Sequence, residues 1–218
     1  MQIDPRRSEA RDALPDAAAG DGRFGPDYYR RYYGDRRTRV SDLAAVRRLL
    51  TFLKGYLAYL RLPVRSVLDV GCGTGQVGIV CRELWPRARY HGFEYSEHLC
   101  ERYGFAHGSA ADFDPQAAFG RDRFDLVVCR GVMQYLDDRA AARALHNLGR
   151  WTAGALYLEA LTERDWQENC DRERTDGDVE LRPGSYYRRR LARDFQTAGG
   201  GLFVARSAGV AMFELEGG

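Results

Sequence analysis

The stretch Val67-Leu-Asp-Val-Gly-Cys-Gly-Thr-Gly-Gln-Val-Gly78 is the part of this 218-residue chain that decides its fold. A short β-branched strand ends at Val70, glycines follow at 71, 73 and 75, and a helix is predicted over 76–84. In a doubly wound sheet such a turn lies at the carboxyl edge of the central strands, where ligands bind. Glycines allow positive φ there and let the backbone approach a ligand closely.

Strands and helices alternate around this loop. Leucine and valine recur at every third or fourth position from Leu43 to Leu60, which predicts a helix that Ser41 or Asp42 can cap. The pattern predicts a doubly wound α/β fold: a mostly parallel seven-stranded sheet with an antiparallel C-terminal strand and an N-terminal helical lid. After residue 88 we predict strands over 89–94, 105–108, 124–129, 155–160, 202–205 and 210–215, and helices over 96–103, 137–151 and 184–197.

Three regions differ in composition. Residues 1–22 have low hydrophobicity and are expected to form a disordered arm. Residues 23–65 carry 11 basic and 3 acidic side chains, a net charge of +8, and form the expected helical lid. Residues 66–218 are the expected Rossmann-like domain. The basic block fits either a nucleic-acid- or anion-binding face or a solvated helical surface.

Composition excludes several classes of protein. The apolar runs are far too short for a membrane span, and the N-terminus lacks the apolar stretch of a secretory signal. The five cysteines form no C-x-x-C pair, and the four histidines form no ligand pattern, so we expect neither disulfides nor a metal site. We therefore expect a cytoplasmic protein, a monomer or a homodimer, with no membrane partner.

An acidic residue follows the glycine loop at an informative distance. Glu94 ends the next predicted strand, 23 residues after Gly71, where a carboxylate would meet a ribose diol. Gly73 to Gly78 also reads G-x-G-x-x-G, so a nicotinamide dinucleotide is one candidate cofactor. Asp69 beside the loop suits a cofactor with a positive centre better than it suits a pyrophosphate.

The glycine loop resembles the first motif of the class I S-adenosylmethionine-dependent methyltransferases, most closely the small-molecule type. Three further segments are similar to that family's motifs, in order and spacing: residues 91–96, 107–113 and 124–136. The resemblance implies S-adenosyl-L-methionine as cofactor and S-adenosyl-L-homocysteine as product. One departure is that Arg130-Gly-Val-Met stands where amino-directed nucleic-acid methyltransferases have N-P-P-[YF], which argues against a base amine as acceptor.

The resemblance also implies roles for individual residues. Glu94 would bind the ribose hydroxyls, Asp112 the adenine amine, and Ala110 and Ala111 would make backbone contacts. Arg130 would pass beneath the cofactor. The cofactor-binding residues expected in full are Asp69, Gly71, Cys72, Gly73, Gly75, Glu94, Tyr95, Ala110, Ala111, Asp112 and Arg130.

The sequence offers several candidates for the residues that would contact the methyl acceptor. Tyr135, Glu159 and Asp165 are candidate bases, the first two being the candidate catalytic residues. Tyr29, Tyr33 and Trp166 are candidates for a lid over the acceptor, where aromatic rings would also attract a sulfonium. We expect methyl transfer to oxygen, nitrogen or carbon of a small molecule, and RNA or protein is the second acceptor class. From other classes, a NAD(P)-dependent oxidoreductase and a non-catalytic partner subunit stay open.

Overall fold

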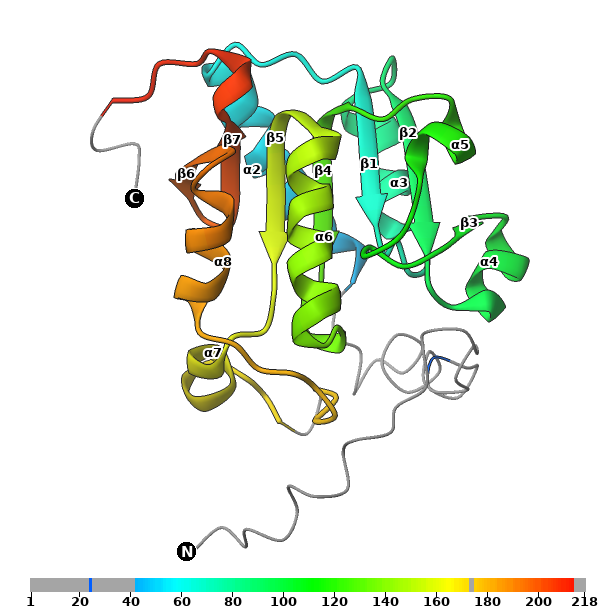
Figure 1. The fold of residues 1–218 in the computed structure, drawn as a ribbon. Helices are drawn as coiled ribbons and strands as arrows, with labels where there is room; N and C mark the ends of the chain where they lie inside the picture. Colours follow the sequence, from blue (N-terminus) through cyan, green and yellow to red (C-terminus); the bar gives the residue numbers. More distant parts are fainter. Residues whose placement is uncertain (1–23, 25–41, 173–174, 214–218) are drawn as a thin grey trace, which may run out of the picture.

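The computed structural model describes residue 24 and residues 42–172 and 175–213. They form a seven-stranded sheet of order β3-β2-β1-β4-β5-β7-β6 (Figure 1). Among these strands β7 runs in the opposite direction to the others, so both β5 and β6 pair with it in the antiparallel sense. The predicted doubly wound, mostly parallel sheet with an antiparallel C-terminal strand is therefore confirmed, whereas the described helix of the predicted lid, residues 43–59, packs on the sheet. The strands are β1 (Ser66–Val70), β2 (Arg89–Glu94), β3 (Ala106–His107), β4 (Phe124–Arg130), β5 (Thr152–Glu159), β6 (Phe195–Gly199) and β7 (Leu202–Ala205).

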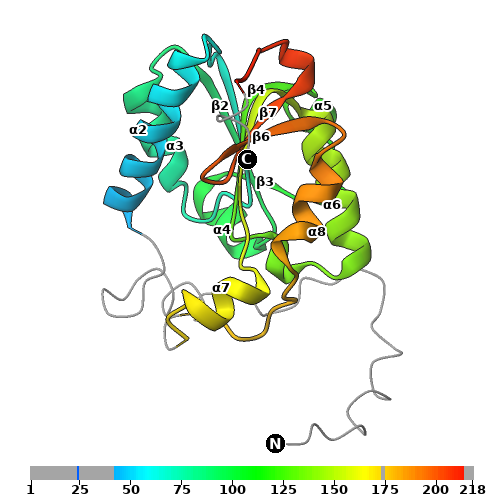
Figure 2. The same ribbon diagram turned by 90° about the vertical axis from the view of Figure 1, so that its left-hand side faces the viewer.

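Helices cover both faces of the sheet (Figure 2). On one face lie α2 (Leu43–Tyr59) and α3 (Gln76–Leu84), and on the other lie α6 (Asp138–Trp151) and α8 (Gly184–Leu191). Asp42 caps α2 by accepting a hydrogen bond from Ala45 N at 2.8 Å, and Asp137 caps α6 in the same way. The shorter helices are α4 (Glu97–Tyr103), α5 (Pro115–Phe119), the 3₁₀ turn η4 (Met133–Tyr135), α7 (Glu163–Glu168) and the 3₁₀ turn η5 (Arg206–Ala208).

Each sheet face has its own apolar core. Val46, Leu50, Leu53 and Leu57 of α2 pack, fully buried, with alternate residues of β1 and β4. The other core joins α6 and α8 to the opposite side chains of the same strands. Because β1 and β4 are buried on both faces, most of their residues are apolar, as in parallel strands generally, and Asp69 of β1 is a buried exception.

The C-terminal part of the prediction is wrong in two places. The helix predicted over 184–197 ends at Leu191, because Phe195 begins β6. The closing hairpin is formed by β6 and β7, and residues 209–213 form no strand. The turn between β6 and β7 uses Gly199, Gly200 and Gly201, all with positive φ. Glycine tolerates that conformation, which explains why the hairpin turns there.

Candidate active site

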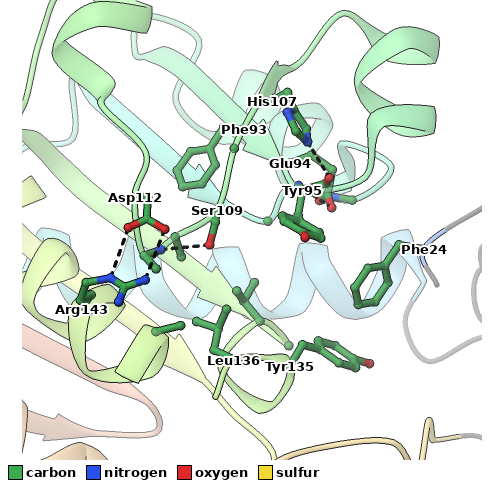
Figure 3. A pocket seen from close by; sticks show the side chains of 18 of the residues that line it. Phe24, Phe93, Glu94, Tyr95, His107, Ser109, Asp112, Tyr135, Leu136 and Arg143 are labelled. Atoms are coloured by element: carbon green, nitrogen blue, oxygen red, sulfur yellow. Dashed lines mark hydrogen bonds and ion pairs between the residues drawn. The ribbon is translucent and has the colours of Figure 1, made fainter. Parts of the chain in front are cut away.

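The loops that follow the parallel strands β1, β2, β3 and β4 lie together at one edge of the sheet. A cavity of about 440 Å³ lies there (Figure 3). Its walls come from the glycine loop after β1, from the ends of β2 and β3, and from the segment after β4. This is the edge at which doubly wound sheets bind ligands.

The glycine loop closes tightly over the end of β1. The N–H groups of Gly71 and Cys72 both donate to the carbonyl oxygen of Phe93, each at 3.0 Å. Gly73 has φ +55°, and a Cβ at this position would meet no atom within 4 Å. The loop therefore presents bare backbone and open space to the cavity at Gly73.

Glu94 holds its carboxylate in a fixed orientation at the cavity wall. The side chain is buried, and Oε2 accepts a hydrogen bond from Gly73 N at 2.7 Å. Oε1 accepts from the backbone N–H groups of Tyr95 at 2.9 Å and Ser96 at 3.1 Å. These charge-assisted bonds join the second strand to the glycine loop and orient the carboxylate.

The end of the cavity away from the glycine loop is lined by small side chains and by one ion pair. Ala110 and Ala111 are buried in its wall, beside Phe93. Asp112 pairs with Arg143 of α6, with Nε and Oδ1 separated by 3.2 Å. Figure 3 shows this pair on the opposite side of the cavity from Glu94. Arg143 lies 31 residues beyond Asp112, on a helix that only the fold brings beside it, so no spacing in the sequence predicts this pair.

A second ion pair lies at the ends of β4 and β5. Arg130 lines the cavity, and its Nε lies 3.2 Å from Oε2 of Glu159. The Tyr157 hydroxyl donates to the same oxygen at 3.0 Å. Glu159 itself is not among the residues that line the cavity. Its carboxylate thus acts on the cavity through Arg130.

Three aromatic rings gather at the mouth of the cavity. The ring of Phe24 makes edge contacts with Tyr95, at 6.1 Å between centroids, and with Tyr135, at 5.2 Å (Figure 3). The carbonyl oxygen of Phe24 accepts a hydrogen bond from the Ser96 hydroxyl at 2.8 Å. An aromatic residue of the N-terminal segment therefore reaches the site.

The family described as "Methyltransferase domain" matches residues 28–200, most of the chain. The chain belongs to the class I S-adenosylmethionine-dependent methyltransferases. Trans-aconitate 2-methyltransferase of Streptomyces coelicolor is 25% identical to it over 186 residues, which are 75% of this chain and 58% of that protein. The chain thus spans less than two thirds of the length of the curated relatives it matches.

Solved methyltransferase structures share the fold. The sugar N-methyltransferase KedS8 of Streptoalloteichus sp. superposes with a TM-score of 0.54 at 23% identity, over 78% of this chain and 89% of that one. The plantazolicin methyltransferase BamL, solved with S-adenosylhomocysteine, gives a TM-score of 0.57 at 16% identity, over 78% and 68% of the two chains. The cofactor of this family is S-adenosylmethionine, which decides between the two cofactors considered from sequence.

The cavity of this methyltransferase fits that cofactor. Gly73 leaves space beside the loop, and the buried carboxylate of Glu94 offers acceptors for sugar hydroxyls. The alanines at 110 and 111 leave room for a flat base, and Asp112 offers an acceptor at its edge. The predicted residues that line the cavity are Gly71, Gly73, Glu94, Tyr95, Ala110, Ala111, Asp112, Arg130 and Tyr135.

Other predicted residues lie elsewhere in the methyltransferase. Asp69, Cys72 and Gly75 are not among the cavity-lining residues. A Cβ on Gly75 would lie 2.9 Å from the Phe105 ring, so this glycine provides close packing. Trp166 lies on α7, with the Arg172 guanidinium 5.3 Å from its ring centroid, and does not line the cavity. Asp165 caps α7 together with Thr162.

Three further predictions concern the lid tyrosines, metal ligands and membrane spans. Tyr29 and Tyr33, the candidate lid tyrosines, lie outside the described residues. Within the described ranges, no group of histidine, cysteine, aspartate or glutamate side chains could hold a metal ion. No helix of these ranges is long and apolar enough to cross a lipid bilayer.

Asp69 is buried near the end of β1, two residues before the glycine loop. Its side chain is 2% exposed, and Oδ2 accepts a hydrogen bond from the Tyr90 hydroxyl at 2.7 Å. Burial raises the pKa of this carboxyl to about 7, although the bond from Tyr90 opposes the shift. The proton is therefore bound more tightly in the folded chain than in the unfolded chain.

The stability of the native chain should depend on pH through the carboxyl of Asp69, and the Asp69→Asn variant should lack this dependence. Because the folded pKa exceeds the ordinary value of 3.8, the contribution of Asp69 is greatest below pH 3.8 and is lost as the pH rises through about 7. The stability of the native chain relative to the variant should fall by roughly 4 kcal/mol between pH 4 and pH 8. Urea unfolding of both proteins across this range measures the difference in their free energies of unfolding. A difference that stays constant from pH 4 to pH 8 would contradict the raised pKa of Asp69.

Arg182 fixes the wall that carries Tyr135. The side chain is 4% exposed, and its guanidinium donates to the carbonyl oxygens of Met133 at 3.1 Å and Leu136 at 2.6 Å. It also pairs with Asp138 at 2.8 Å. One buried cation therefore accounts for the carbonyls of Met133 in η4 and of Leu136 directly after it, and joins the loop before α8 to this wall.

Replacing Arg182 with glutamine should destabilise the fold by about 3 kcal/mol, because buried carbonyls lose their donors. The matched control is Arg189→Gln, on the exposed surface of α8, which should change stability by less than about 0.5 kcal/mol. Thermal or chemical unfolding measures both. Equal stabilities of the two variants would show that Arg182 does not hold this wall.

Proposed function

We propose that this chain transfers the methyl group of S-adenosylmethionine to an oxygen, nitrogen or carbon atom of a small-molecule acceptor. The observation that carries the proposal is the buried carboxylate of Glu94, tied to Gly73 at 2.7 Å on the rim of the cavity. This pairing of an acidic strand end with a bare glycine loop matches the ribose and amino-acid ends of that cofactor. The bound sulfonium supplies an activated methyl group.

The residues of the chain then act by binding, orientation and exclusion of water. Glu94 would accept hydrogen bonds from the ribose hydroxyls, and Asp112 one from the adenine amine. Phe24, Tyr95 and Tyr135 cover the mouth with aromatic surface, which keeps water from the reacting atoms. Alignment of two reactants in a closed site supplies much of the rate enhancement of such transfers.

The acceptor would enter beside Arg130 and Tyr135. Arg130 places a positive charge on this wall, and its pairing with Glu159 fixes the guanidinium. Glu159 is engaged with both Arg130 and Tyr157. Tyr135 is therefore the better candidate of the two predicted catalytic residues, because it reaches the cavity directly.

The relatives of this chain support a small acceptor. The relatives named above act on small compounds: trans-aconitate, and a sugar in the KedS8 enzyme. Within the described part of the basic block, Arg47 is paired with Glu83 at 2.8 Å, whereas Arg48, Lys54, Arg61 and Arg65 are exposed. RNA therefore stays the second acceptor class and is included in the test below.

The proposal is tested by label transfer. The full chain is incubated with methyl-labelled S-adenosylmethionine and with carboxylic acids, amino sugars, phenols or total RNA in separate reactions. We expect label in at least one small-molecule class and none in RNA, and Tyr135→Phe should show whether a hydroxyl is needed. Label in RNA alone would overturn the acceptor class, and absence of transfer to any acceptor would favour the non-catalytic alternative.

A further inference from the structure

Two side chains on consecutive turns of α6 hold the turn that follows β3. The Ser109–Asp112 turn forms the end of the cavity away from the glycine loop. Within it, Asp112 N donates to Ser109 O at 3.0 Å, and Ala111 N donates to the Ser109 hydroxyl at 3.2 Å. These bonds define the turn but leave the carbonyls of Ala110 and Ala111 in need of donors.

Asn147 supplies both donors. Its Nδ2 lies 3.1 Å from the carbonyl oxygen of Ala110 and 2.9 Å from that of Ala111. Both alanines are buried, with exposed fractions of 3% and 4%. A buried carbonyl without a donor is costly, so one amide group stabilises the backbone of two consecutive residues. Asn147 itself does not line the cavity.

Arg143, one turn earlier on α6, orients the carboxylate at the end of the same turn. Its Nε contacts Asp112 Oδ1 at 3.2 Å, and Nη2 contacts Oδ2 at 3.4 Å. The two side chains are 45% and 59% exposed, so the pair adds little to the stability of the fold. Its larger effect is geometric, because a two-point contact fixes the plane of the carboxylate.

The fixed carboxylate can discriminate between purines. An ionised carboxylate only accepts hydrogen bonds. The exocyclic amine of adenine is a donor, whereas the oxygen at the same position of hypoxanthine is an acceptor and would face the carboxylate without a hydrogen atom between them. A site built for one donor rejects the analogue that lacks it, provided that the site cannot relax.

We propose that Asn147 and Arg143 are positioning residues that set the preference of this site for adenine, by holding the Ser109–Asp112 turn and the Asp112 carboxylate rigid. This inference rests on the proposed function, since it concerns the base of the same cofactor. Arg143 also lines the cavity, whereas Asn147 does not, so Asn147→Ala separates the positioning role from any direct contact with the base.

Calorimetry with two ligands tests this inference without any acceptor. S-adenosyl-L-homocysteine and S-inosyl-L-homocysteine differ only in the base, and we expect the native chain to prefer the adenosyl compound by about 100-fold. In Asn147→Ala and Arg143→Ala this ratio should fall about tenfold or more, mainly through weaker adenosyl binding. The matched control is Arg139→Ala, an exposed residue one turn before Arg143 on α6 that does not line the cavity.

The outcomes separate this inference from the proposed function. If the native chain binds neither compound, the proposed function fails. If the native chain binds the adenosyl compound but both variants keep the native ratio, or lose affinity for both ligands equally, the positioning role is overturned. Should Asn147→Ala unfold, Arg143→Ala decides the question, because its exposed side chain can be removed without emptying the core.

Discussion

Replacing Glu94 with glutamine is expected to weaken the binding of S-adenosylhomocysteine by about 10- to 150-fold. Hydrogen bonds to a charged group contribute about 1.5–3 kcal/mol, which corresponds to this range. Glutamine keeps the size of the side chain, but its amide nitrogen can no longer accept. In either orientation that nitrogen would also face a backbone N–H, of Gly73 or of Tyr95 and Ser96.

The control for this variant is Glu97→Gln. Glu97 is exposed in the first turn of α4, three residues beyond Glu94, and should bind the ligand as the native chain does. Circular dichroism and thermal unfolding establish that both variants are folded, and calorimetry gives the affinities. Native affinity in folded Glu94→Gln would remove this carboxylate from the cofactor site.

The Gly71→Ala variant should lose more than 100-fold in affinity for the same ligand. Gly71 has φ +67°, and an added Cβ would lie 2.4 Å from Cγ2 of Val132, a residue of the cavity wall. A β-branched side chain has few alternative rotamers, so the glycine loop or the wall must shift. Left-handed strain and overpacking together should lower stability by about 2–4 kcal/mol.

Gly120→Ala separates strain from the specific clash. Gly120 ends α5 with φ +69°, close to the value at Gly71, but an added Cβ would meet nothing within 4 Å. This variant should therefore lose only about 1 kcal/mol of stability and bind the ligand normally. Unfolding curves and calorimetry on the pair measure the difference, and equal ligand affinities would mean that the loop at Gly71 does not shape the cavity.

The glycine loop and its strands were predictable because their signals are local. A β-branched strand, three glycines and an apolar helix stand next to one another in the chain, and Glu94 ends the following strand. The end of α8 was missed because Phe195 also suits a helix, and the competing signal, three glycines at 199–201, lies beyond it. Helix α7 lies next to a charged loop and has no buried residue, so no apolar period reveals it.

The missed residues of the cavity share a physical cause. Phe24, Arg143 and Asn147 reach the cavity or its supporting turn only because the chain folds back on itself. No spacing along the sequence encodes a contact between β3 and α6, since that contact depends on how the helix packs on the sheet. The same reason explains why Glu159 was placed at the acceptor edge, whereas its carboxylate reaches the site through Arg130.

The most direct measurement of the central claim is calorimetric titration of the full chain with S-adenosylhomocysteine and, in parallel, with NADH. We predict one tight site per chain for the nucleoside, lost or severely weakened in Glu94→Gln, and no heat with the dinucleotide. A chain that binds NADH but not S-adenosylhomocysteine, or that binds neither, would contradict the account.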